Sequence, residues 1–151
     1  MRLVTSSDVQ KLTGLTSDQL REWTVRRKLI EPDAKPNGPG TRARFAWQTV
    51  LLLRIVVVLK DQFHVELQAH KPSFASLSSR LNQASFPSLR GTAAVLRAGG
   101  GAEVVAIEEL LSVEGDFLSV ALDAHLDVLS SGFGFVEPVR QLPLFPVRAV
   151  A

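Results

Sequence analysis

Arginine side chains near the N-terminus offer the clearest chemistry in the sequence. Arg21 and Arg26 lie five positions apart in a segment with helical spacing, and Arg42 and Arg44 alternate with less polar residues further along. A guanidinium group binds phosphate, and in a DNA major groove it donates two hydrogen bonds to guanine. Glu22 can accept a hydrogen bond from cytosine or orient its neighbour Arg21. These residue types favour contact with a polyanion.

The charge distribution favours the same chemistry. The whole chain has a net charge of only +2. Residues 1–64, however, hold 11 Lys and Arg against 6 Asp and Glu, whereas residues 65–151 hold 6 against 9. The first part is therefore basic and the second acidic. This asymmetry predicts that the N-terminal part meets a polyanion and that the remainder has another role.

Enzyme chemistry has little support in the sequence. The chain contains no cysteine, which excludes disulfides, thiolate metal sites and cysteine nucleophiles. His64, His70 and His125 lack the spacing of metal ligands on a helix, and neither an HExxH motif nor a nucleophile elbow occurs. The three glycines at 99–101 are typical of a turn and match no phosphate-binding fingerprint. We therefore expect no catalytic residue, no cofactor and no metal site.

Two segments bear on the location of the protein. Residues 1–10 lack the apolar run of a signal peptide. The strongest apolar run, residues 50–59, contains Arg54 and is half the roughly 20 residues that a membrane span needs. We therefore expect no membrane partner and a cytoplasmic, nucleoid-associated protein.

Two predicted helix starts position the first arginine. Ser7 with Gln10, and Thr16 with Gln19, match the capping box, in which a hydroxyl residue is followed three positions later by Gln or Glu. A short glycine-containing turn at residues 13–15 separates the two helices, as a helix-turn-helix requires. We predict the second helix over residues 17–27.

The second predicted helix has one apolar face. At about 100° per residue, Leu20, Trp23 and Thr24 fall on one side, which is expected to pack. The opposite side is then free to enter a major groove. A solvated amphipathic helix without a ligand has the same pattern, so this helix alone does not decide the function. The free side carries Asp18, Arg21, Glu22, Val25 and Arg26.

A predicted β-wing follows this helix. Residues 36–40 (PNGPG) indicate a tight loop, and the next five residues alternate with a period of two. Arg42 and Arg44 then face phosphates, whereas Ala43 and Phe45 face the core. Residues 47–63 are rich in apolar side chains and predict a helix that is buried on several sides.

The order of these segments resembles the DNA-binding unit of the MerR family over about residues 3–63. The resemblance implies a bacterial transcription regulator whose winged helix-turn-helix binds double-stranded DNA. The matching motifs are residues 11–16 (KLTGLT), 20–23 (LREW), 29–32 (LIEP) and 41–45 (TRARF).

The resemblance also implies which residues contact DNA. Arg21 and Trp23 contact the duplex, Arg42 clamps a phosphate from the wing, and Thr16 and Ser17 approach the strand. A buried core aromatic is an equally good interpretation of Trp23. Together with the exposed helix face and the basic run after it, the predicted DNA-binding set is Thr16, Ser17, Asp18, Arg21, Glu22, Trp23, Arg26, Arg27, Lys28, Thr41, Arg42 and Arg44.

Three positions depart from the family pattern. The stretch from Trp23 to Leu29 is one residue longer than in the family. Lys28 stands where the family usually has glycine, and Ala46 replaces the usual hydroxyl cap before the third helix. The resemblance therefore does not fix the local geometry at these positions.

The region after Phe63 differs from the family as well. A MerR-type regulator usually pairs through a long coiled coil, but no sustained heptads follow here. Periodicity instead predicts a short amphipathic helix with apolar residues at 74, 77, 81 and 84. Short strands are predicted at residues 94–96, 104–107 and 118–122, with a hairpin loop at 98–102.

These elements predict an α+β fold in three parts. A winged helix-turn-helix occupies residues 1–64, a small mixed region for dimerisation or effector binding occupies 65–137, and an extended proline-rich tail occupies 138–151. The expected function is a homodimeric regulator that binds an inverted repeat and distorts the DNA, with RNA polymerase as a further partner. Two alternatives stay open: an excisionase-like or architectural DNA-binding protein, and a protein-interaction adaptor with the same fold.

Overall fold

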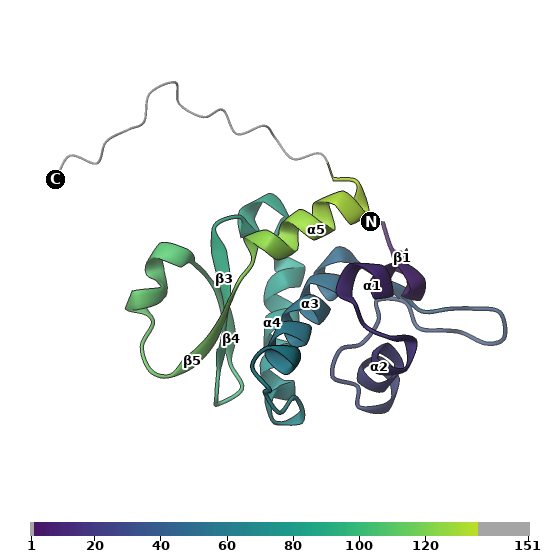
Figure 1. The fold of residues 1–151 in the computed structure, drawn as a ribbon, viewed down its shortest axis with the longest axis horizontal. Helices are drawn as coiled ribbons and strands as arrows, with labels where there is room; N and C mark the ends of the chain where they lie inside the picture. Colours follow the sequence, from purple (N-terminus) through teal and green to yellow (C-terminus); the bar gives the residue numbers. More distant parts are fainter. Residues whose placement is uncertain (1, 136–151) are drawn as a thin grey trace, which may run out of the picture.

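Helix α3, Trp47–Asp61, runs through the centre of the fold (Figure 1). The computed structural model describes residues 2–135, so the predicted tail at 138–151 and the last two residues of the region before it lie outside the described residues. Ten of the fifteen residues of α3 are buried, which confirms the predicted helix with several packed sides. Helices α1 (Ser6–Thr13), α4 (Lys71–Gln83) and α5 (Asp123–Phe133) pack against it.

Helices and strands are mixed, so the predicted α+β class is confirmed. Strands β1 (Val4–Thr5) and β2 (Arg44–Phe45) form a small antiparallel sheet. The larger sheet has the order β4-β3-β5, and both pairings are antiparallel. All three of its strands were expected, and they span Thr92–Arg97 (β3), Ala102–Ala106 (β4) and Phe117–Ala121 (β5).

The larger sheet lies on the far side of α4 from α1 (Figure 1). Its inner face contributes Ala94, Leu96 and Val120 to the core, and α4 contacts both β3 and β4. The connection from β4 to β5 has to pass from one edge strand to the other, and it includes the short helix Ile107–Ser112. Arg97 anchors the end of this connection, since its Nη1 donates to the Glu114 carbonyl at 2.6 Å.

The first helix begins two residues earlier than its predicted capping box at Ser7. Thr5 is the N-cap: its Oγ1 accepts a hydrogen bond from the Asp8 amide at 3.2 Å, and the Asp8 carboxylate accepts one from the Thr5 amide at 3.0 Å. The hydrogen bonds from Thr5 lower the pKa of Asp8. The prediction was wrong because it required Gln or Glu at the third position, whereas Asp fills that role here.

The second helix does have the predicted capping box. The Thr16 Oγ1 accepts from the Gln19 amide at 3.1 Å, and the Gln19 side chain accepts from the Thr16 amide at 3.0 Å. The α-helical part, α2 (Ser17–Arg21), continues directly into a π-helical segment, η1 (Glu22–Arg26). The Arg27 amide donates to the Glu22 carbonyl at 2.8 Å, which spans five residues instead of four.

The π-helical segment lies where the MerR resemblance implies one additional residue, between Trp23 and Leu29. A π-turn takes up one residue more than an α-turn between the same two ends. Such a turn can accommodate one additional residue, and Leu29 and Ile30 after it are buried. Lys28 adopts a left-handed backbone with φ of 50°, the conformation that favours glycine. Lys28 thus has the left-handed conformation that a glycine at this position, as in the MerR pattern, would adopt readily.

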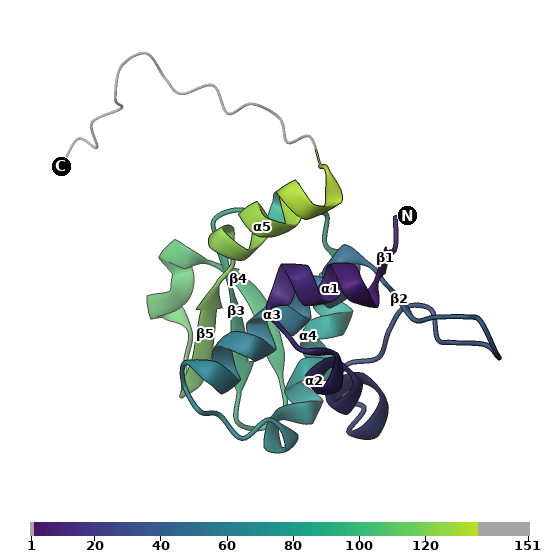
Figure 2. The same ribbon diagram turned by 45° about the vertical axis from the view of Figure 1, so that its right-hand side comes forward.

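The exposed loop at residues 35–43, called the wing loop below, projects from the body in both views (Figures 1 and 2). Its base is closed by strand pairing of Arg44 with Thr5 and by an isolated bridge between Ala34 and Arg44. Within the loop, Thr41 Oγ1 donates to the Gly38 carbonyl at 2.7 Å. The paired strand is shorter than the predicted strand over residues 41–45, because only its last two residues form a ladder.

The start of α3 lacks a hydroxyl cap, and a carboxylate from another segment takes its place. Ala46 is the N-cap of α3 and has no side-chain cap. The Asp33 carboxylate accepts a hydrogen bond from the Ala46 amide at 2.7 Å. A carboxylate at this position also interacts favourably with the positive end of the helix dipole.

Helix α5 returns to the N-terminal helices (Figure 2). Arg54 of α3 donates hydrogen bonds to the Leu12 carbonyl and to His125 Nδ1. A Cβ added at Gly132 would lie 2.3 Å from Cδ2 of Leu12, so glycine permits the close approach of α5 to α1. One cluster of buried apolar residues extends from Val4 to Phe133. The predicted boundary at residue 64 therefore falls between elements that share a core, and the division into parts stays a prediction.

Candidate nucleic-acid interface

The second helix, α2 with η1, has the two faces predicted from its sequence. Leu20, Trp23 and Thr24 are buried, and the Thr24 hydroxyl donates to the Leu20 carbonyl at 2.8 Å. Arg21 is exposed, and Val25 is 60% exposed although it is apolar. The helix therefore packs by one face and offers the other to solvent.

A groove lies between this exposed face, the start of α1 and the wing loop. Its volume is about 330 Å³, and it is called the wing groove below. Arg21 from α2 and Arg42 from the wing loop both line it. None of its lining residues is acidic. The others are Ser6, Gln10, Ser17, Leu20, Thr24, Val25, Pro36, Thr41, Ala43 and Phe45.

An adjoining depression extends the basic surface around the wing loop. It has a volume of about 630 Å³ and shares Ser6, Thr41 and Arg42 with the wing groove. Arg44 lines this second depression, which again has no acidic side chain. The residues in the two linings thus form one surface that carries three arginines.

The three arginines of this surface are not neutralised by neighbours. Within residues 2–135, the side chains of Arg21, Arg42 and Arg44 make no hydrogen bond or ion pair. A guanidinium group that is exposed and unpaired is available to a phosphate or to a base edge. This surface can therefore bind a polyanion without first breaking an internal contact.

The start of α1 also lines this surface, which the sequence did not predict. Ser6 and Ser7 stand in the first turn of α1, and Ser6 contributes to both depressions. These two serines bring hydroxyl groups to the surface, and Asp8, the acidic residue of the same turn, lines neither depression. The capping box of Thr5 with Asp8 was the signal in the sequence that could have placed Ser6 and Ser7 in the first turn.

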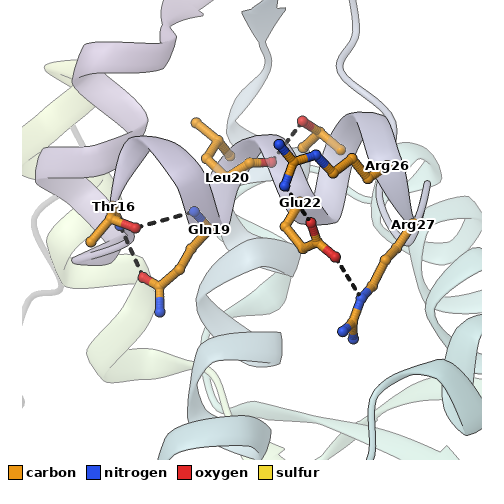
Figure 3. Close-up of polar contacts among 7 residues, drawn as sticks. Thr16, Gln19, Leu20, Glu22, Arg26 and Arg27 are labelled. Carbon is orange, nitrogen blue, oxygen red and sulfur yellow. Dashed lines mark hydrogen bonds and ion pairs between the residues drawn. The ribbon is translucent and has the colours of Figure 1, made fainter.

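Glu22 binds two cations on the other side of the second helix (Figure 3). Its carboxylate oxygens lie 3.1 Å from Arg26 Nη1 and 3.1 Å from Arg27 Nε. The hydrogen bond from Arg26, followed by that from Arg27, lowers the pKa of Glu22. Glu22 therefore does not orient Arg21, as one prediction had it, because its carboxylate is engaged elsewhere.

The predicted DNA-binding residues consequently lie on two different faces. Arg26 and Arg27 line a separate depression of about 260 Å³ between the second helix and Lys60 of α3. Asp18 and Glu22 line it too, so this face has mixed charge. The uniformly basic face is the wing groove with the depression beside it. Of the predicted set, Ser17, Arg21, Thr41, Arg42 and Arg44 belong to the basic face.

Three further predicted residues have other surroundings. The predicted DNA contact of the Trp23 side chain is wrong, because this side chain is 2% exposed and its ring packs in the core with Lys60 Nζ 5.4 Å from its centroid. The Thr16 hydroxyl is engaged in capping α2. Lys28 lines a fourth depression, together with Lys71 of α4.

Comparisons with known proteins leave the resemblance as a prediction. No model of a protein family matches the chain, and no curated protein matches it. In residues 2–135 no three His, Asp or Glu side chains are grouped as a metal would require. Among the described helices, none has both the length and the apolar character needed to cross a bilayer.

Proposed function

We propose that this protein is a transcription regulator that binds double-stranded DNA through the wing groove. The observation that carries the proposal is the pair Arg21 and Arg42, two unpaired arginines from different elements that line one groove without acidic residues. Surfaces that bind DNA need such unscreened cations, because neutralising phosphates supplies most of the affinity.

The two arginines suit different parts of a duplex. Arg21 projects from an exposed helix, and an exposed helix fits the major groove, where arginine distinguishes guanine. Arg42 and Arg44 belong to the wing, which suits the adjoining phosphates. Ser6 and Ser7, in the first turn of α1, add hydroxyl donors for the same backbone.

The resemblance to the MerR family supports a dimer on an inverted repeat. One DNA-binding unit of this size covers few base pairs, and two-fold symmetry doubles the contact. We propose half-sites separated by about one or two helical turns, a bent or untwisted centre, and RNA polymerase as a further partner. The cytoplasm, at the nucleoid, is the compartment in which this activity is expected.

Selection from random duplexes tests the proposal directly. The full-length protein is incubated with a randomised duplex pool, and bound sequences are enriched over several rounds. We expect an inverted repeat, two protomers per duplex and an affinity that falls steeply with salt. If no sequence is enriched, and if the amount of duplex that the protein retains does not depend on salt, the adaptor alternative is favoured. One protomer on a straight duplex, measured by titration and by permuted-site gel mobility, would contradict the dimer and the distortion.

A further inference from the structure

A pocket of about 380 Å³ lies between the end of the second helix and helix α4. One wall is the segment from Lys28 to Glu31, which follows η1. The opposite wall is a single stripe of α4, because its residues are spaced as i, i+3, i+4 and i+7. This stripe consists of Lys71, Phe74, Ala75 and Ser78.

The floor of the pocket is apolar and packed. Leu29, Ile30, Leu52 and Phe74 line it, and each of them is buried in the core. Ala75, by contrast, is exposed and small, so the α4 wall leaves room above Phe74. Concave sites of about 300–1,000 Å³ with an apolar lining and few polar groups are typical of small-molecule sites.

Two ammonium groups set the charge that the pocket accepts. Lys28 and Lys71 belong to opposite walls. The one acidic residue of the lining, Glu31, is already paired with Lys35 at 3.5 Å. Lys71 Nζ makes one hydrogen bond, to the Arg27 carbonyl at 3.3 Å, and an ammonium group has three donors. A carboxylate between the two lysines would therefore find free donors.

We propose that this pocket binds a small organic acid, with its carboxylate between Lys28 and Lys71 and an apolar body against Leu29, Ile30 and Ala75. The contact between Lys71 and Arg27 suggests a consequence for the second helix. Arg27 closes the π-turn through its amide and pairs with Glu22 through its side chain. A carboxylate on the free donors of Lys71 competes with the Arg27 carbonyl for the same ammonium group, and weakening the bond of 3.3 Å between Lys71 and Arg27 would change the end of the second helix and so its affinity for DNA. This consequence, unlike ligand binding itself, rests on the proposed function.

The binding step is tested with three probes on the full chain, by calorimetry and by amide NMR shifts. Octanoate combines a carboxylate with an apolar body, octan-1-ol lacks the charge, and inorganic phosphate lacks the apolar body. We expect octanoate alone to bind, with shifts centred on Leu29, Ile30 and Ala75. Equal binding of octan-1-ol, equal binding of phosphate, or shifts scattered over the surface would each overturn the site.

Variants locate the site. Lys71→Gln and Lys28→Gln are expected to weaken octanoate binding about tenfold each, because a charge-assisted hydrogen bond is lost. Ala75→Leu fills the pocket from an exposed position and should abolish binding. Lys11→Gln on α1 removes the same charge outside the pocket and should change nothing. Unchanged octanoate affinity in both pocket lysine variants would contradict the proposal even if the Ala75→Leu protein does not fold.

The coupling step is measured separately, as the affinity of the full chain for its selected duplex with and without octanoate. We expect a change of several-fold that the Lys71→Gln variant does not show. An unchanged DNA affinity with octanoate bound would overturn the coupling. Octanoate binding by a protein that selects no DNA would overturn the proposed function while the ligand site stands.

Discussion

Arg54 donates a hydrogen bond from Nε to Nδ1 of His125 at 3.1 Å, and this contact joins the central helix α3 to α5. Burial, with a smaller contribution from the charge of Arg54, lowers the pKa of His125 below its ordinary value of 6.5. Nδ1 can accept this hydrogen bond only while it carries no proton. A protonated ring would lose the bond and face a second positive charge.

We therefore predict that the protein becomes less stable as the pH falls below about 6.5. The unfolded chain takes up a proton at His125 in this range, whereas the folded chain resists it, so protonation favours unfolding. The free energy of unfolding from urea titrations between pH 7.5 and 5 checks this. His125→Asn keeps an acceptor without a titrating ring and should flatten the profile. His64→Asn, which changes an exposed histidine, should leave the profile as it is.

The wing arginines should contribute affinity without sequence preference. We predict that Arg42→Ala and Arg44→Ala weaken binding to specific and random duplexes alike. Each should also reduce the salt slope by about one unit, because each removes one phosphate contact. Fluorescence anisotropy at several salt concentrations measures both quantities. Lys35→Ala is the matched control, since Lys35 is a wing-loop cation already paired with Glu31. An unchanged slope in both arginine variants would remove the wing from the interface.

Arg21 should contribute discrimination instead. We predict that Arg21→Ala lowers the preference for the selected sequence by roughly 1–3 kcal/mol at particular base pairs. Arg21→Lys keeps the charge but lacks the paired donors, so it should retain the salt slope and still lose much of the preference. Competition between single-base variants of the site measures the effect. An equal loss of affinity for specific and random DNA would show that Arg21 contacts the phosphate backbone and not a base.

Glu22 holds two cations that a phosphate would otherwise attract. We predict that Glu22→Gln strengthens binding to random DNA and steepens its salt dependence, because Arg26 and Arg27 are released. Asp18→Asn removes the same charge from the same helix, where no ion pair is broken, and serves as the control. If the two variants have the same salt slope, Arg26 and Arg27 stay away from the duplex.

Lys28 has a backbone conformation that non-glycine residues adopt at a cost of roughly 1–2 kcal/mol. We predict that Lys28→Gly raises the free energy of unfolding by up to about 1 kcal/mol, since part of this gain is offset by the greater freedom of glycine in the unfolded chain. Lys28→Ala loses the charge and retains the strained conformation. Equal stability of the glycine and alanine variants would show that charge, and not backbone conformation, decides at this position.

The elements with strong periodicity could be predicted from the sequence. The capping box at Thr16, the buried face with Leu20, and the three strands of the larger sheet depend on local patterns, and all are present. The faces of the second helix were predictable too, because Leu20 and Glu22 stand about 200° apart on a helical repeat and so fall on opposite sides. The α+β class follows from these elements together.

Contacts between distant segments could not be predicted. No local pattern indicates that Asp33 would serve the amide of Ala46. The pairing of Glu22 with Arg26 differs, because its i,i+4 spacing is a local signal that favours Arg26 over the adjacent Arg21. The burial of Trp23 could not be predicted either, because an aromatic side chain fits a core and a DNA interface equally well. Its burial depends on α3, which lies more than twenty residues away in the chain.

The π-turn at Glu22 confines a change in chain length to one place. In a regular α-helix one additional residue would rotate all later side chains by about 100° and turn the anchors Leu29 and Ile30 out of the core. Here the hydrogen bond from the Arg27 amide to the Glu22 carbonyl closes a turn that is one residue longer than an α-turn, and both anchors are buried. Chains that differ by a single residue at this turn can therefore keep the same core and present different cations beyond Val25. Insertion or deletion, and not only substitution, becomes a route to a new recognition surface.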